Sequence, residues 1–445
     1  MFLYVVASLQ MVAQTPRQDI QRLMTVAERN YPLLRSKSFD VLSAEKQVDI
    51  MKSSVIPSLD AAYQVGYGTH NGIAGLYNPQ YLMALSAPPS AENSASGVFG
   101  SAASLLLNWQ PVTFGQRKSQ VDYARAGTDV ARADEKNAIF NHQARVIDVY
   151  LDALTANEIV KVNEDNLKRC EANLTQVSSL VNSGIKPGVD TALFKSELSK
   201  ARVDLLNSRK YQDQYRILLS QLLATDSVII FTGKPFFNSL PSYGNDTQGI
   251  PHPLVSLYES NVAAGISHRN MLSKTTMPTL GFWGNTYVRG SGLHYDGTIK
   301  STDGLGFQRY NYGVGLQLSM PLLQGLRVKP QLERDELLVR SETEKLNEVK
   351  LRLSKQQEIA DTLLNNAFAV ARESPMFLES AQYSYRAIGS RYGSGLATYA
   401  DLIQTQYTLL RAETEQKLYY MAVWKAWLYK AAVAGDLNLF INRIN

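Results

Sequence analysis

The chain of 445 residues has little of the side-chain chemistry that catalysis and metal binding require. Cys170 is the only cysteine, so no disulfide can form within one chain. No nucleophile with a plausible base stands out, and Gly313 and Gly315 lack the helix that follows the glycines of a phosphate-binding loop. The histidines show no spacing typical of metal ligands (His70, His142, His252, His268 and His294). We therefore expect no enzyme activity, no metal and no cofactor.

Blocks of like charge and long apolar runs are also missing. The formal net charge is +5 without a cluster of lysine and arginine, so nucleic acid is not an expected partner. Residues 1–14 hold a short apolar run followed by small and polar residues, which predicts the remnant of a signal peptide. A short buried helix is the alternative for this segment. After it, no apolar stretch reaches the ~18 residues of a membrane-spanning helix.

The chain does contain a duplication. Pro111–Arg117 leads into a long helix-forming run, and Pro321–Arg327 does the same. Further on, the segment Gly184–Asp190 is matched by Gly395–Asp401, and the offset between these two segments nearly equals the offset between the first pair. A constant spacing between similar segments indicates a repeated unit. The expected parts are a first repeat at 15–224, a linker at 225–251 and a second repeat at 252–445.

Alternation of apolar with small or polar residues, which is typical of a strand, occurs twice in each repeat. The four segments are about 58–69, 98–110, 279–289 and 310–320. In the last segment one face carries the larger apolar side chains (Tyr312, Val314, Leu316, Leu318 and Met320). A length of about ten residues suits a strand that crosses a membrane, so we expect this face to meet membrane lipid.

Four such strands are too few to close into a barrel within one chain. The smallest membrane barrels have about eight strands, so the sheet is expected to close between chains. Two chains would give a lumen filled by side chains, whereas three would give an open pore. Because the second face of the strands is small and polar, we favour three chains and twelve strands.

The remaining sequence predicts long helices. Residues 18–54 are expected to form one helix. Residues 116–224 and 328–434 are each expected to form a helical hairpin, with a kink at Pro375 in the second. Helices of this length are typical of coiled-coil packing, and two adjacent apolar stripes indicate neighbours on both sides, as in a ring. The fold class is therefore a mixed α and β membrane protein.

The order helix, strand, strand, long helix, turn and helix, given twice, resembles the TolC-like outer-membrane efflux proteins, also called outer membrane factors. Local matches are the stretch from Ala27 through Asn30 and Pro32 to Leu34, and the two turns that run from glycine to aspartate. The resemblance implies a homotrimer in the bacterial outer membrane, whose β-barrel continues as an α-helical coiled-coil barrel in the periplasm. It also implies a passive duct of a tripartite efflux or type I secretion system, which docks to a periplasmic membrane-fusion adaptor and an inner-membrane transporter.

The resemblance places the two turns at the periplasmic tip of the channel, where the gate is expected. The candidate gate residues are carried by these turns and the adjoining helix ends (Gly184, Asp190, Tyr392, Gly395, Asp401 and Gln404). Glycine permits a positive φ where a helix ends. Asp190 and Asp401, near the starts of the returning helices, can cap free N–H groups. The alternative role is that three Asp401 side chains, one per chain, form an acidic ring in the closed entrance, and both interpretations stay open.

The second turn departs from the family pattern at two positions. Gln404 stands where relatives have a second acidic residue, and Ala397 stands where they have a basic one. Tyr392 does match a tyrosine of the family's tip network. These differences predict a rewired contact between the hairpins and a weaker cation-selecting ring.

A second hypothesis from another class is an exported structural or periplasmic adaptor protein built on long helical hairpins. Adaptors normally have one hairpin per chain, flanked by lipoyl-like and small β-barrel modules. Two hairpins and four alternating strands favour the channel.

Overall fold

The computed structural model describes residues 16–69, 71–72, 92–225, 234–242, 244 and 251–444. The expected signal peptide at 1–14 and most of the expected linker at 225–251 lie outside these residues. The chain divides into two compact units. The first comprises Met1–Ser43, Thr128–Ala263 and Arg340–Asn445, and the second comprises Ala44–Gly127 and Ala264–Val339.

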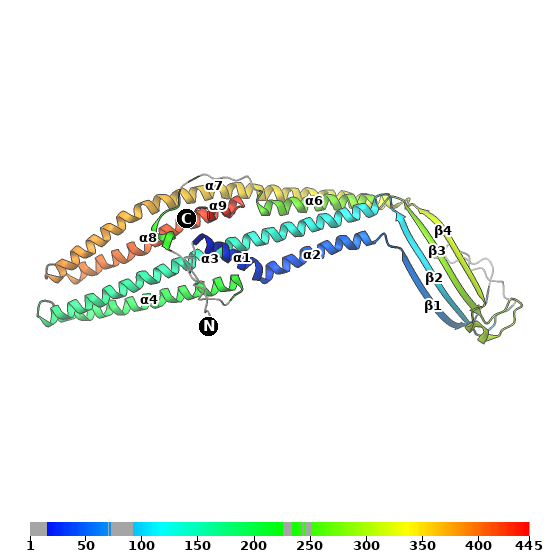
Figure 1. Cartoon of the computed structure of the whole chain (residues 1–445), viewed down its shortest axis with the longest axis horizontal. Helices are drawn as coiled ribbons and strands as arrows, with labels where there is room; N and C mark the ends of the chain where they lie inside the picture. The colour runs from blue at the N-terminus through cyan, green and yellow to red at the C-terminus, as the bar shows by residue number, and fades with distance from the viewer. Residues whose placement is uncertain are drawn as a thin grey trace, which may run out of the picture. The chain divides into compact units, whose positions relative to one another are not determined.

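The second unit contains a four-stranded antiparallel sheet in the order β1-β2-β3-β4 (Figure 1). The strands are β1 (Ser58–Gly68), β2 (Val98–Val112), β3 (Thr279–Ser291) and β4 (Arg309–Ser319). The ladder between β2 and β3 shifts register between Trp109 and Val112, where Pro111 has no N–H to donate. The loop after β3 contains a short 3₁₀ helix, Ser301–Leu305.

The register aligns the apolar side chains of all four strands on one face. Ala61 pairs with Leu105, Leu105 with Thr286, and Thr286 with Tyr312. Leu316, Leu318 and their neighbours on β4 are all exposed in the single chain. The strand was expected to extend to Met320, but β4 ends one residue earlier, at Ser319.

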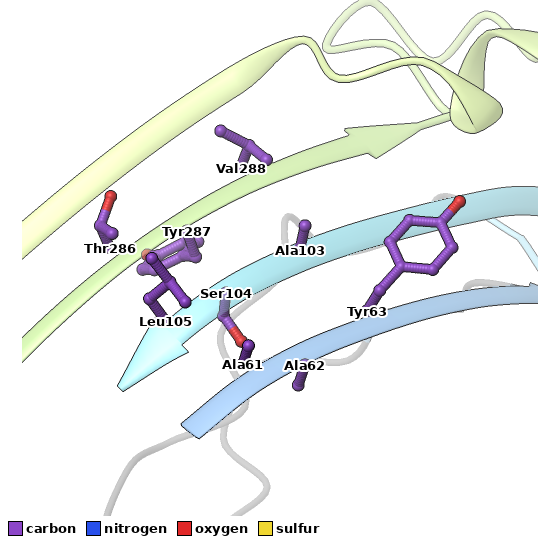
Figure 2. A pocket seen from close by; sticks show the side chains of 9 residues that line it. All are labelled: Ala61, Ala62, Tyr63, Ala103, Ser104, Leu105, Thr286, Tyr287 and Val288. Atoms are coloured by element: carbon purple, nitrogen blue, oxygen red, sulfur yellow. The ribbon is translucent and has the colours of Figure 1, made fainter. Parts of the chain in front are cut away.

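Small side chains leave a shallow hollow in the middle of this sheet. It is lined by residues of β1, β2 and β3, among them Ala61, Ala62 and Ala103 (Figure 2). Figure 2 shows the larger Tyr63 and Leu105 at its margin.

The face opposite the apolar one carries mostly small and polar side chains, with Leu106, Trp283 and Tyr287 as larger members. The Trp283 ring covers Gly313 and Gly315 of β4. A Cβ added to Gly315 would lie 2.7 Å from the indole ring, so glycine is needed there. Gly313 and Gly315 lie within β4, and their lack of a side chain makes room for the Trp283 ring.

The helices account for most of the rest. They are α1 (Pro16–Asn30), α2 (Pro32–Ser53), α3 (Gln116–Asn182), α4 (Gly188–Leu223), α5 (Lys234–Asn238), α6 (Pro253–Lys274), α7 (Gln324–Gly393), α8 (Tyr399–Ala434) and α9 (Asn438–Ile441). No described helix has an apolar stretch long enough to cross a membrane.

One detail of the helices differs from the sequence-based expectation. The single helix expected over 18–54 is divided at Tyr31, because Pro32 is favoured at a first helical position and disfavoured inside a helix. Pro375 lies inside α7, as expected.

Within the first unit, α3 and α4 form one hairpin and α7 and α8 form another (Figure 1). Gln212 on α4 donates to Asn157 on α3 at 2.8 Å, and Arg209 pairs with Glu164. The main core joins both hairpins, since Tyr150 of α3 and Trp427 of α8 are fully buried in it. The chain reverses direction between α3 and α4 and again between α7 and α8, at one end of each hairpin.

Candidate gate at the hairpin turns

The two turns have the same backbone geometry. Gly184 and Gly395 have φ values of 72° and 79°, the left-handed region that glycine tolerates best. The amide of Ile185 donates to Leu180 O at 2.9 Å, and that of Leu396 donates to Arg391 O at 2.8 Å. Each glycine N–H also bonds three residues back, which completes the motif that commonly ends helices. Both glycines therefore stop a long helix and reverse the chain.

The two aspartates that follow these turns have different surroundings. Asp401 is exposed and completes a capping box at the start of α8. Its carboxylate accepts from the Thr398 amide at 2.9 Å, while the Thr398 hydroxyl accepts from the Asp401 amide at 3.2 Å. The hydrogen bonds from Thr398 lower the pKa of the Asp401 carboxyl. Gln404, one turn further along α8, is also exposed.

Asp190 is buried and does not cap its helix. The N-cap of α4 is Pro187, and no side chain caps it. Instead, the Asp190 carboxylate accepts a hydrogen bond of 2.9 Å from the hydroxyl of Tyr392, which is only 1% exposed. Burial is the larger cause, and Asp190 the second, of a pKa for Tyr392 far above the usual range. This contact joins α4 of one hairpin to α7 of the other.

A basic side chain from the first turn reaches the second turn. Lys186 donates from Nζ to the backbone oxygen of Ala397 at 2.9 Å. The same ammonium lies 4.5 Å from the centre of the Tyr392 ring, a favourable cation–π position. The second turn lacks its own basic residue at Ala397, and the first hairpin supplies one instead.

A second set of contacts between the hairpins surrounds Glu197 on α4. Its carboxylate accepts from the hydroxyls of Tyr399 and Tyr407, both on α8. Burial, followed by the charge of Glu197, raises the pKa of Tyr399 to about 12. Lys200 donates to the Tyr407 hydroxyl at 3.0 Å.

Sequence reasoning identified Asp190 and Tyr392 but missed Lys186, Glu197 and Tyr399. The eight-residue spacing of Tyr399 and Tyr407, which keeps both rings near one face of α8, was the available signal.

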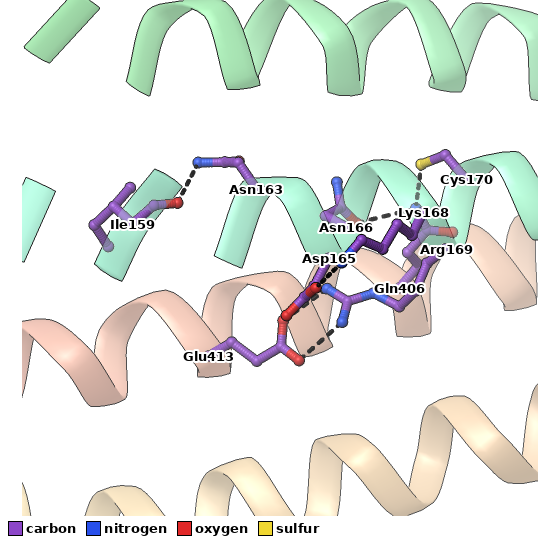
Figure 3. Close-up of polar contacts among 9 residues, drawn as sticks. All are labelled: Ile159, Asn163, Asp165, Asn166, Lys168, Arg169, Cys170, Gln406 and Glu413. Carbon is purple, nitrogen blue, oxygen red and sulfur yellow. Dashed lines mark hydrogen bonds and ion pairs between the residues drawn. The ribbon is translucent and has the colours of Figure 1, made fainter. Parts of the chain in front are cut away.

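Further along the hairpins, a polar cluster lies between α3 and α8 (Figure 3). Arg169 and Glu413 form a bidentate pair with N–O distances of 2.9 and 2.6 Å. The amide of Gln406 is buried and contacts the Cys170 sulfur at 2.9 Å. Burial raises the pKa of the Cys170 thiol, which keeps the group in its unreactive form. The Arg169–Glu413 and Gln406–Cys170 contacts join α3 to α8 in the observed register.

Among the residues whose structure is described, no group of three His, Cys, Asp or Glu side chains is arranged to hold a metal ion. The candidate site is a set of hydrogen bonds and ring contacts between the two helical hairpins.

Comparison with known proteins agrees with this geometry. Residues 23–225 match the outer membrane efflux protein family. The chain is 21% identical over 369 residues to Protein CyaE of Bordetella pertussis, which covers 80% of this chain and 76% of that protein. It is 22% identical over 431 residues to the pyoverdine export outer membrane protein OpmQ of Pseudomonas putida, covering 94% and 86%.

Solved structures show the same fold at low sequence identity. CusC superposes with a TM-score of 0.75 at 12% identity, covering 94% of this chain and 92% of that one. The Campylobacter jejuni outer membrane channel CmeC gives a TM-score of 0.72 at 12% identity, covering 94% and 86%. Residues 23–225 thus match the outer membrane efflux protein family, and the chain has the fold of solved outer-membrane channels over 94% of its length.

Proposed function

We propose that three copies of the chain form one export duct, with the sheets in the outer membrane and the helical hairpins in the periplasm. The observation that carries this proposal is the sheet itself, whose edge strands β1 and β4 pair with no other described strand. Unpaired strand edges are not tolerated in lipid. Because β1 and β4 run in opposite directions, β4 of one copy can pair with β1 of the next and continue the antiparallel order.

The two faces of the sheet support the same assembly. The apolar face, with Tyr312, Leu316 and Leu318 on β4, suits contact with lipid. The polar face suits a water-filled lumen, and twelve strands give a lumen wide enough to remain open. Three copies meet both requirements.

The helices of the first unit also carry apolar side chains that a single chain leaves exposed. On α4 these include Leu206 and Ile217, and on α7 they include Leu351 and Ile359. Several exposed apolar side chains on the same helices are typical of a protein interface. In a ring of hairpins, each copy would cover these side chains of the next.

The contacts between the turns support a gate. To open the tip, the hairpin of α7 and α8 would have to move away from that of α3 and α4. This movement would break the Tyr392–Asp190 and Lys186–Ala397 hydrogen bonds and would expose a buried carboxylate. A hydrogen bond to a charged group that is exchanged for water on opening contributes roughly 1.5–3 kcal/mol to the closed state. The closed state is therefore favoured until a partner compensates for these contacts.

The tips of the turns offer a docking surface for such a partner. Ile185, Val189 and Leu396 are apolar and exposed beside the gate contacts. We assign this surface to a periplasmic adaptor that connects the duct to an inner-membrane transporter. The alternative of an adaptor role for this chain is less favoured, since the fold carries two hairpins and a sheet with an apolar face.

Planar-bilayer recordings of the purified full-length chain test the duct. We expect channels of low conductance, because the tip contacts hold the gate closed. Cysteines placed at 186 and 397 in a Cys170→Ser background, joined by a reducible cross-linker, should lower the conductance further, and reduction should restore it. Either single-cysteine variant serves as the control. A purified trimer that never conducts would contradict the proposal.

A further inference from the structure

The polar face of the sheet contains a second hollow, at the end where β1 and β3 run into their loops. Its volume is about 520 Å³, within the range of small-molecule sites. The small residues Gly66, Gly100 and Ala102 contribute to its lining, together with the polar side chains of Gln64 and Arg289. The register explains this grouping, since Gln64 pairs with Ala102 and Ala102 with Arg289.

The described residues leave open space in this hollow. A Cβ added at Gly66 or Gly68 would meet no atom of the described residues within 4 Å, and neither glycine has a positive φ. Glycine weakens a strand, so its presence there without a steric reason indicates that the space itself is used. A ligand can approach the backbone closely at such positions.

Two arginines lie directly opposite each other beside the hollow. Arg289 on β3 pairs in register with Arg309 on β4, and both side chains are exposed. Like charges directly opposite in an antiparallel pair are destabilising. Neither arginine forms an ion pair with any acidic residue in the described part of the chain. The only acidic residue within the four strands is Asp60, near the other end of β1.

Neighbouring groups orient these guanidinium groups without neutralising them. The Arg289 guanidinium lies 6.0 Å from the centre of the Tyr287 ring, and Arg309 donates from Nη1 to Gln308 O at 3.1 Å. Most of their N–H groups therefore stay available. A guanidinium offers a planar fork of donors that matches a carboxylate, sulfonate or phosphate.

We propose that Arg289, Arg309 and Gln64 form a binding site for an organic anion in transit through the lumen. The inference rests on the proposed duct, because the polar face is the lumen only in the closed trimer. An anion in the hollow would relieve the repulsion between the two arginines and accept hydrogen bonds from both. Three such sites would give the loop end of the pore a preference for anionic cargo, whatever the charge at the tip.

Blockade of single channels by a small planar trianion, benzene-1,3,5-tricarboxylate, tests the site. The probe is added separately to each side of a bilayer that holds the full-length protein. We expect a block from one side only. The double variant Arg289→Gln/Arg309→Gln should raise the half-blocking concentration at least about tenfold, as expected for losing charge-assisted hydrogen bonds. Gly66→Val, which fills the hollow without changing charge, should also weaken the block.

Arg327→Gln is the matched control, because it removes one exposed positive charge at the start of α7, away from the hollow. It should leave the half-blocking concentration unchanged. An unblocked wild-type channel, or equal block of the wild type and the double variant, would overturn the anion site and leave the duct intact. Absence of channels in every variant would overturn the duct, and the anion site with it.

Discussion

At the scale of single residues, the two aspartates after the turns show how one motif acquires two roles. Asp401 has its hydrogen bonds within its own turn, so it stabilises α8 whether or not the other hairpin is near. Asp190 has its side-chain partner on the other hairpin, so its burial depends on the closed position of the turns. The spacing from glycine to aspartate is the same in both turns, so the spacing alone does not reveal that Asp190 is buried and Asp401 exposed.

The substitution Tyr392→Phe removes the hydroxyl and keeps the ring packed. We expect it to destabilise the closed tip by about 1–3 kcal/mol, because the buried Asp190 carboxylate loses its donor. Channel conductance in planar bilayers should rise. Tyr383→Phe, at an exposed position of α7, is the control and should leave conductance at the wild-type level. Equal conductance of the two variants would remove the Tyr392–Asp190 contact from the gate.

Asp401 gives a prediction for acid pH. Its folded-state pKa lies below the ordinary value of 3.8, so its stabilising contribution is present above that pH and is lost as the pH falls through the lower, folded value. Asp401→Asn removes the titrating charge at nearly constant shape. The melting temperatures of the wild type and this variant should therefore differ at neutral pH and converge below pH ~3.8. A difference that persists in acid would exclude the carboxylate charge as its cause.

Among the elements, the strands and hairpins could be predicted from the sequence, because alternation with period two and long runs without proline or glycine are patterns of neighbouring residues. The hairpin turns could be predicted from their glycines for the same reason. The contacts between the hairpins could not be predicted, because Lys186 and Ala397 are far apart in sequence and meet only through tertiary packing. The division of the first helix at Tyr31 was missed because the apolar pattern continues across Pro32.

The pairing of Arg169 on α3 with Glu413 on α8 should hold the register between these helices. We expect a double-mutant cycle with Arg169→Gln and Glu413→Gln to give a coupling energy of about 1–2 kcal/mol, since both groups are largely buried and bidentate. Chemical unfolding of the four proteins measures it. The exposed pair Arg352–Glu348, within α7, is the control and should couple by less than about 0.5 kcal/mol. Similar coupling in both cycles would contradict a special role for the buried pair.

Alkaline pH should loosen the contact between α4 and α8. The pKa of Tyr399 is raised to about 12 from its ordinary 10.0, so the folded state favours the neutral phenol. Its contribution is complete below pH 10 and is lost as the pH rises through about 12. The difference between ultraviolet absorbance titrations of the wild type and Tyr399→Phe should report this late ionisation. A difference centred near 10 would contradict the packed Tyr399–Glu197 contact.

For the whole molecule, the edge strands β1 and β4 pair with no other described strand, and the apolar strand face and helix faces are exposed. In the proposed trimer, other copies would pair the edges of the sheet, while lipid and neighbouring helices would cover the apolar faces. The sequence indicated this need for partners because four strands cannot close, but it did not reveal the ring of Trp283 on the polar face, which depends on Gly313 and Gly315 across the ladder.

The direction of the sheet faces can be tested by placing a charge on each. Leu316→Arg puts an arginine on the apolar face at a cost of roughly 2–4 kcal/mol per copy in lipid, so membrane assembly should fail. Gln317→Arg, the adjacent residue on the polar face, should assemble normally. Comparison of trimer yields from membranes measures both. The reverse outcome would show that the faces are the other way round.

The mass of the purified particle shows whether three chains close one membrane-embedded duct, as proposed. Light scattering with the detergent contribution subtracted should give three chains of 49.5 kDa each, extracted from membranes only with detergent. A single chain that stays in solution without detergent would exclude the trimeric duct.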